Sequence, residues 1–125
     1  MSDRVLRHLF TGFVRLHILY HAARQPICGV EIMDELRHHG YSLGPGTLYP
    51  VLHDLERAGL LRSQQKVVEG KRRRNFTITP RGRRLLAQAR TKLVELAAEI
   101  LYDQDALAAR QQAAPSPPAP PAGPS

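Results

Sequence analysis

The spacing of apolar residues changes twice along the chain, and these two changes constrain the fold more than any other feature. Up to Leu60, apolar residues recur mostly three or four positions apart, which is typical of amphipathic helices. From Leu61 to Thr79 the pattern alternates with a period of two, as in strands. After Pro80 the helical spacing returns. We therefore expect helices on both sides of one β-hairpin.

Three helices are predicted before the hairpin, over residues 6–20, 29–39 and 45–57. Gly40 stands where a helix end commonly takes up a left-handed conformation, which glycine adopts most easily. Pro45 stands where a first helical residue needs no free N–H. The second and third helices are therefore expected to be joined by a tight turn.

The predicted hairpin has strands over residues 61–67 and 75–79, with a turn at residues 69–71. Two short helices joined by a tight turn and followed by a hairpin form a winged helix-turn-helix. The expected fold class is mainly α with a small β-hairpin: a winged helix-turn-helix with a long C-terminal dimerisation helix.

The last helix is expected to begin at Thr79 and Pro80, which are typical of a cap and a first helical residue, and to run to about Gln111. The apolar residues of this helix form a narrow stripe along it, called the seam below. Such a seam on a helix of about 30 residues usually packs against another helix. We therefore expect a homodimer, with the first helix packed against the seam. The predicted interface residues are Leu9, Phe13, Leu16, Leu86, Leu93, Leu96 and Ile100.

Positive charge is concentrated in one stretch of the chain. The net charge is +7, from 18 basic and 11 acidic residues, but residues 62–92 hold 11 basic residues and one acid, Glu69. That stretch therefore carries +10 and the rest of the chain −3. Such a patch favours a polyphosphate partner, most often nucleic acid. The alternative is a charged surface that only faces water.

Composition narrows the class of partner. No Trp, four Tyr and three Phe leave few platforms for base stacking, which argues against a single-strand binder. No apolar run approaches the roughly 18 residues of a membrane helix, so no membrane partner is expected. One cysteine excludes an internal disulfide and fits a reducing cytosol. Double-stranded DNA is therefore the predicted partner, and the cytoplasm, at the nucleoid, the predicted location.

The helix over residues 45–57 is the candidate reader of the DNA major groove. Its outer face offers Gly46, Tyr49 and His53, with Thr47 at the flank. Thr47 can bond a base edge or a phosphate, and the Tyr49 phenol suits a phosphate oxygen. The alternative for Tyr49 is packing beside its neighbour in the helix.

The hairpin is the candidate wing. Four consecutive cations repel one another, so folding alone does not favour them, whereas a phosphate backbone or a narrow minor groove does. Because alternate strand residues point to opposite faces, only some of these cations are expected to contact DNA. The candidate wing contacts are Lys66, Lys71, Arg72, Arg73 and Arg74. Arg81, Arg83 and Arg84 open the last helix, where the dipole disfavours cations unless an anion binds.

No enzymatic site is predicted. The chain has no serine motif, no glycine-rich phosphate loop and no paired carboxylates in an apolar frame, so neither catalysis nor a cofactor is expected. His17 and His21 are four apart on a helix, which is chelating geometry, and Cys28 is close in sequence. No further ligand follows at a zinc-site spacing, so no metal site is predicted. Cys28 is expected to be a buried thiol. Metal sensing stays open as the alternative.

Five short motifs place the chain beside a known family. They are Gly-Val-Glu-Ile (29–32), Leu-Gly-Pro-Gly-Thr-Leu-Tyr-Pro (43–50), Leu-His-Asp-Leu-Glu (52–56), Arg-Arg-Arg-Asn-Phe (72–76) and Thr-Pro-Arg-Gly (79–82). With these motifs the chain resembles the PadR family of bacterial transcriptional regulators over about residues 5–105. The resemblance implies a dimeric DNA-binding repressor. It also implies DNA contacts by Thr47, Tyr49 and residues 71–74.

Two positions depart from the family pattern. Gly44 replaces the usual serine before the proline, which removes a hydroxyl that could bind phosphate. Phe76 replaces the usual tyrosine, which removes any bond from that phenol.

The predicted function is that of a sequence-specific transcriptional regulator of double-stranded DNA. We expect a ligand-responsive repressor that acts as a homodimer on a palindromic operator, with a small-molecule effector as a further partner. The alternative is a basic interaction module that binds RNA or an acidic protein. The expected domains are a DNA-binding domain over residues 1–80, the dimerisation helix over 81–112, and a disordered Pro/Ala-rich tail over 113–125, which holds six of the ten prolines.

Overall fold

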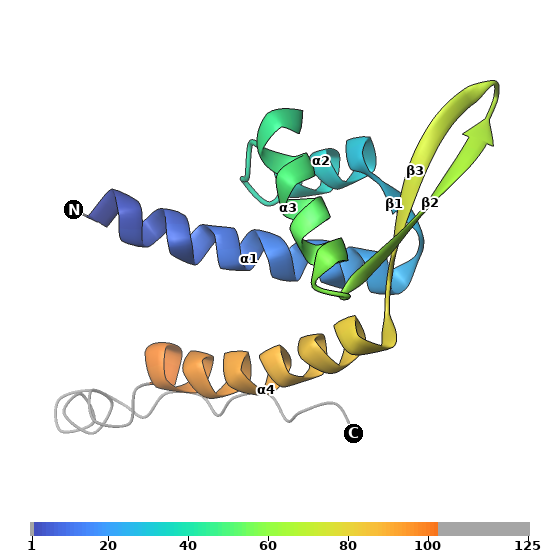
Figure 1. Ribbon diagram of the computed structural model, residues 1–125. Coiled ribbons are helices and arrows are strands. Elements are labelled where there is room, and N and C mark those ends of the chain that lie inside the picture. Colours follow the sequence, from blue (N-terminus) through green and yellow to red (C-terminus); the bar gives the residue numbers. More distant parts are fainter. Residues whose placement is uncertain (1, 103–125) are drawn as a thin grey trace, which may run out of the picture. The chain divides into compact units, whose positions relative to one another are not determined.

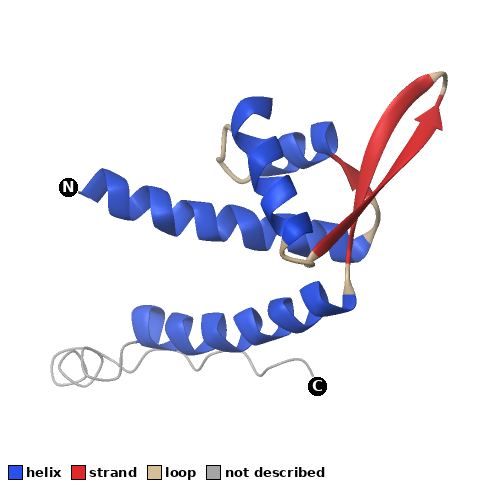
Figure 2. Ribbon diagram, viewed as in Figure 1, coloured by secondary structure: helices blue, strands red, loops and turns tan. Residues whose placement is uncertain are grey.

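A computed structural model describes residues 2–102 of the protein, with side chains from residue 4 onward. The elements follow in the order α1 (Ser2–Arg24), β1 (Ile27–Cys28), α2 (Gly29–His38), α3 (Pro45–Arg57), β2 (Leu61–Val68), β3 (Lys71–Ile78) and α4 (Pro80–Tyr102) (Figure 1). Helices dominate and the strands form one small sheet (Figure 2), which confirms the predicted fold class. The predicted tail and the predicted end of the last helix lie outside the described residues.

The chain divides into two compact units between residues 88 and 89. The first unit contains the winged helix and the start of α4, and the remainder of α4 belongs to the second. The predicted division into residues 1–80, 81–112 and 113–125 stays a prediction. No helix within residues 2–102 is long and apolar enough to cross a membrane.

The sheet has one strand more than the sequence pattern predicts. Its order is β1-β3-β2, and both pairings are antiparallel. The extra strand β1 is two residues long and pairs Ile27 with Phe76 and Cys28 with Asn75. Cys28 is buried as expected, and it is both the last residue of β1 and the N-cap of α2. A two-residue strand is too short for the alternation that identifies strands in a sequence.

The hairpin is longer and its turn is tighter than predicted. Strands β2 and β3 pair from Leu61 opposite Ile78 to Val68 opposite Lys71. The turn consists of Glu69 and Gly70, which have φ angles of 53° and 76°. Positive φ at both central residues is typical of a type I′ turn, whose twist matches that of the flanking strands. The basic residues 71–74 therefore lie in strand β3 and not in the loop.

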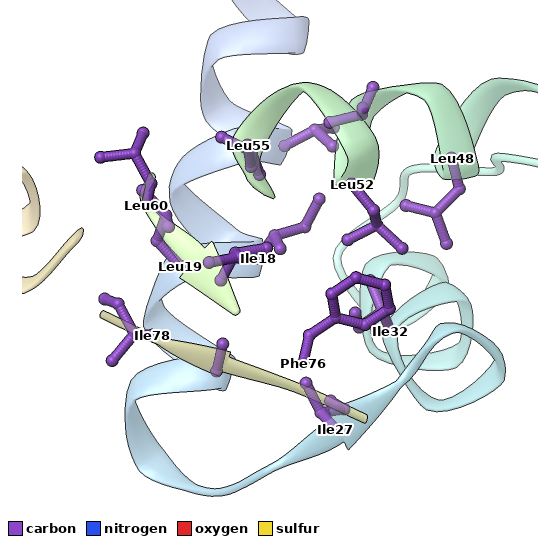
Figure 3. Packing of buried hydrophobic residues seen from close by; sticks show 14 of the residues in the cluster. Ile18, Leu19, Ile27, Ile32, Leu48, Leu52, Leu55, Leu60, Phe76 and Ile78 are labelled. Carbon is purple, nitrogen blue, oxygen red and sulfur yellow. The ribbon is translucent and has the colours of Figure 1, made fainter. Parts of the chain in front are cut away.

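The core of the first unit lies where α1, α2 and α3 meet the sheet. Phe76 on β3 is completely buried, and its ring lies toward Leu52 and Ile32 (Figure 3). The stripe predicted for α3 faces inward, since Leu48, Leu52 and Leu55 are all buried. Burying one such side chain contributes about 1.5–3 kcal/mol, so this core holds α3 firmly on its neighbours.

The connection between β3 and α4 depends on Thr79 and Gly82. The Thr79 hydroxyl accepts a hydrogen bond from the Gly82 N–H at 3.0 Å and donates to the Gly59 carbonyl at 2.6 Å. This is the predicted N-cap of α4. Gly82 is buried, and a methyl group there would press on the Leu60 carbonyl and lie 2.6 Å from Cγ1 of Ile78. The glycine of the Thr-Pro-Arg-Gly motif thus permits the start of α4 to pack closely against Leu60 and Ile78.

Candidate nucleic-acid interface

A hollow opens where α2 begins, and the hairpin forms one of its walls. Its volume is about 340 Å³, and it is lined by residues 28–30, by Tyr49 on α3 and by residues 71–74 on β3. The first N–H groups of a helix have no partner within the helix, and they attract anions. The hollow therefore combines a helix start with four exposed cationic side chains, which is an arrangement suited to a phosphate group.

Tyr49 has two roles in this hollow. Its ring is half-buried and packs against the core cluster. Its hydroxyl reaches Gly29, the first residue of α2, at a point where any side chain would collide with it. Gly29 thus makes room for the phenol at the wall of the hollow. Residues 28–30 were not predicted as part of a site, although Gly29 opens one of the family motifs.

The four residues proposed on α3 do not share one face. Gly46, Thr47 and His53 are exposed. Thr47, however, lines a different hollow, which lies beside α1 and the turn after α2, whereas Tyr49 lines the hollow at the hairpin. Two positions of a helix are about 200° of rotation, so residues 47 and 49 necessarily face apart. Thr47 and Tyr49 are therefore presented to different surfaces of the first unit.

Two cations of the wing lie opposite each other in the hairpin. Lys66 on β2 lies directly opposite Arg73 on β3. Like charges in directly opposed positions destabilise a pair of strands, by up to about 1 kcal/mol. The stability of the hairpin therefore gains nothing from this pair, and an anion bound between the two side chains would reverse the sign of the effect.

A polar network ties the hairpin to α3. The Glu56 carboxylate on α3 accepts hydrogen bonds from both the N–H and the hydroxyl of Ser63 on β2. Arg74 on β3 donates from Nη1 to the Ser63 hydroxyl oxygen at 2.8 Å. Arg74 is thus held by the protein itself, and the network sets the position of the wing relative to α3. Ser63 carries no sequence signal for this role, whereas Glu56 is the last residue of the Leu-His-Asp-Leu-Glu motif.

One carboxylate lies beside the hollow. Glu31 in the first turn of α2 accepts a hydrogen bond from the Cys28 N–H at 3.0 Å. That backbone hydrogen bond lowers the pKa of the Glu31 carboxyl, and the positive charge of Arg73 lowers it further. Glu31 is therefore ionised at neutral pH and offsets one of the neighbouring cations.

The cations that open α4 have contacts of their own. Arg83 donates from Nη2 to the Ala23 carbonyl, at the end of α1, over 3.3 Å. The side chain of Arg81 runs past Gly59. Because carbonyls at a helix end carry partial negative charge, the contact to Ala23 explains Arg83 without a bound anion.

The sequence itself matches a known family across this region. Residues 18–88 match the model of the transcriptional regulator PadR-like family. The match includes α2, α3 and both strands of the wing. The chain belongs to the PadR-like family of transcriptional regulators. The resemblance inferred from the short motifs is thereby confirmed, and the family is a class of DNA-binding regulators and not of enzymes.

Individual proteins named as transcriptional regulators or transcription factors resemble the chain over most of its length. Transcriptional regulator Rv3488 of Mycobacterium tuberculosis is 50% identical over 99 residues, which are 79% of this chain and 92% of that protein. A PadR-like transcription factor from Bacteroides fragilis has a TM-score of 0.68 at 23% identity, covering 80% of this chain and 98% of its own. The regulator TA0346 of Thermoplasma acidophilum has a TM-score of 0.67 at 26% identity, covering 77% and 93%. These structures share the winged-helix fold.

The predicted interface residues of this PadR-like chain fall in both units. In the first unit, Leu9 is 46% exposed, Phe13 and Leu16 are half-buried, and Leu86 packs on the core cluster. In the second unit, the seam of α4 is open to solvent, with Leu93, Leu96 and Ile100 exposed by 41%, 46% and 69%. Their role in a dimer stays a prediction.

A histidine cluster lies apart from the hollow. His17, His21 and His39 have ring nitrogens that all lie within 4.8 Å of one another. Cys28, which sequence proximity had suggested as a neighbour, is not among them. Burial lowers the pKa of His17, and the charges of His39 and His21 lower it further. The sequence pattern missed His39 because it lies 18 positions after His21, far outside the usual ligand spacings.

Proposed function

We propose that this PadR-like protein is a sequence-specific repressor that binds a palindromic double-stranded operator as a homodimer and responds to a small-molecule effector. The observation that carries the proposal is the hollow formed by the start of α2, Tyr49 and residues 71–74. We assign to this hollow a phosphate of the DNA backbone. The exposed side of α3, with Gly46 and His53, then enters the major groove.

Charge and geometry support the phosphate assignment. Lys66 and Arg73 oppose each other in the hairpin, and a phosphate beside them converts repulsion into attraction. The Tyr49 hydroxyl can donate a neutral hydrogen bond to the same group. Of the four consecutive cations, Arg74 is bound to Ser63, which leaves Lys71, Arg72 and Arg73 for contacts to the phosphate.

The exposed seam of α4 supports the homodimer. Leu93, Leu96 and Ile100 repeat at three and four positions and are exposed in the single chain. Soluble monomers rarely expose a long contiguous apolar stripe, and a second copy of the helix would cover this one. A two-fold dimer presents two reading helices to half-sites about one helical turn apart, which is why the operator is proposed to be palindromic.

The hollow beside α1 supports a small-molecule effector. Its volume is about 350 Å³, within the range of small-ligand sites. Apolar and aromatic side chains line much of it, including Phe10, Val14 and Tyr41. Thr47, in the first turn of α3, is part of the same wall. A ligand there would contact the helix proposed to read DNA.

The alternative function is a basic module that binds RNA or an acidic protein. To separate the two, a duplex would be selected from a random pool with the purified chain, and binding measured by fluorescence anisotropy. The proposal predicts two chains per selected palindromic duplex and, at physiological salt, affinity for it at least about a thousandfold above a scrambled duplex. Equal affinity for scrambled duplex, hairpin RNA and an acidic peptide would favour the alternative.

A further inference from the structure

Three imidazoles from two helices converge on one point of the winged helix. His17 and His21 lie one turn apart on α1, and His39 is the C-cap of α2. The rings of His17 and His39 stack with their centroids 4.4 Å apart, and those of His21 and His39 are 6.1 Å apart. All three offer a ring nitrogen within 4.8 Å of the other two. Packing alone seldom brings three basic groups together.

The nitrogen of His21 within this cluster is buried without a hydrogen bond. Its Nε2 atom has no hydrogen-bond partner in the part of the chain that the structure describes. The nearest acid is Glu35 on α2, whose Oε2 lies 3.8 Å from that nitrogen. This distance is too long for a hydrogen bond. Buried polar atoms in proteins are nearly always satisfied, so an atom like this one requires an explanation.

The donor set has the chemistry of a transition-metal site. Neutral imidazole nitrogens suit Zn²⁺ and its neighbours, whereas Mg²⁺ and Ca²⁺ require oxygen ligands. Burial and the adjacent rings favour the neutral form of His17, which is the form that binds metal. Histidines four apart on one helix present both nitrogens on the same side, as in known zinc motifs.

The distances require only side-chain movement. Tetrahedral Zn²⁺ with bonds of about 2.0 Å holds neighbouring nitrogens ~3.3 Å apart, and the nitrogens here lie within 4.8 Å. Rotation of the side chains closes this difference, because His39 stands exposed at the end of α2. Glu35 lies on the same side of the cluster as His21 and can supply a fourth, oxygen ligand.

We propose that His17, His21 and His39 bind one divalent transition-metal ion of the Zn²⁺ class, with Glu35 completing the coordination. The bound ion links α1 to α2. The site shares no residue with the hollow at the wing, so a test of metal binding is independent of the proposed DNA contact.

The test uses the untagged full-length chain, stripped of metal with a chelator that is then removed. Calorimetric titration with Zn²⁺ is expected to give one ion per chain, and Co²⁺ is expected to develop the visible absorption of a tetrahedral site. Zn²⁺ should also raise the melting temperature in a concentration-dependent way, because it binds the folded chain. Mg²⁺ should do none of these.

Variants connect the binding to the cluster. His39→Ala and His17→Ala are each expected to lower Zn²⁺ affinity roughly tenfold or more, and Glu35→Gln to lower it less. His38→Ala is the matched control, since His38 is the adjacent, exposed histidine outside the cluster and should bind as the unmodified chain does. Far-UV circular dichroism checks the fold of each variant. Absence of saturable Zn²⁺ binding, or binding that His39→Ala leaves unchanged, would overturn the proposal.

Discussion

The hydroxyl of Tyr49 on α3 lies against Gly29, the first residue of α2, so closely that no side chain fits at position 29. The two residues come from different helices of the helix-turn-helix, and both line the hollow at the wing. This contact places a phenol beside the cations of β3. It also explains, in physical terms, why glycine stands at the start of the Gly-Val-Glu-Ile motif.

Tyr49→Phe should affect DNA binding more than stability, whereas Gly29→Ala should reduce both, because the displaced ring packs on the core. Gly29→Ala displaces the phenol, and Tyr49→Phe removes its hydroxyl while leaving its ring on the core. Each should weaken DNA binding by about 1.5–3 kcal/mol if the hydroxyl bonds a phosphate. Thermal melting and anisotropy measured on the same samples test this. A Tyr49→Phe chain that binds DNA normally would show that the hydroxyl makes no such contact.

The network of Glu56, Ser63 and Arg74 should stabilise the position of the wing. Ser63→Ala removes a hydroxyl that is bonded on both sides, so we expect a loss of about 1 kcal/mol in unfolding free energy. Adding Glu56→Gln should cost less than the sum of the two single changes, because both variants break the same network. Urea denaturation measures these free energies.

The matched control for these variants is Asp54→Asn, which breaks exposed ion pairs with Arg57 on the same helix and with Arg15 on α1. Such pairs contribute little, so its effect should stay within about 0.5 kcal/mol. Strict additivity of Ser63→Ala and Glu56→Gln would indicate that the two side chains do not act together.

Glu31 should make a pH-dependent contribution to stability. Its pKa lies below the ordinary value of 4.5, chiefly because its carboxylate accepts the Cys28 N–H. A lowered carboxyl pKa contributes stability above the ordinary pKa and loses it as the pH falls through the folded value. Glu31→Gln should therefore be slightly less stable than the unmodified chain at pH 7, and the difference should vanish in acid. A difference that is constant from pH 7 to pH 3 would contradict this.

The exposed seam of α4 should be the dimer interface. Leu93→Glu combined with Leu96→Glu places two charges on the seam and should reduce the mass in sedimentation from two chains to one. Val94→Glu is the control, because Val94 is exposed on α4 but lies off the seam. If the unmodified chain sediments as a monomer at micromolar concentration, or the double variant stays dimeric, the seam has another role.

The sequence predicted the elements well where periodicity is long and end signals are strong. The predicted and observed bounds of α3 agree because Pro45 begins the helix and Gly59, with a φ of 78°, follows its end. The two-residue strand β1 escaped prediction because it is too short to have a period. β3 begins at Lys71, earlier than predicted, because the turn needs only Glu69 and Gly70.

The candidate site was predicted less completely, because it depends on contacts between distant segments. The cations of β3 were evident from their density alone. The pairing of Tyr49 with Gly29 depends on how α2 and α3 pack, and no local pattern reports that. The same holds for His39, which reaches His17 only through the fold.

The most direct test of the account compares affinity for the selected operator and for random duplex across several salt concentrations. Arg72→Ala and Arg73→Ala should weaken both and lower the salt slope by about one unit each, while Arg37→Ala, at the opposite end of α2, should change neither. Thr47→Ala and His53→Ala should cost about 1–3 kcal/mol on the operator and less on random DNA. Tyr49→Ala, which removes the phenol from the hollow proposed to hold a phosphate, should weaken binding to both duplexes. Wing variants with unchanged salt slopes, together with equal losses on both duplexes for Thr47→Ala and His53→Ala, would contradict the proposed interface.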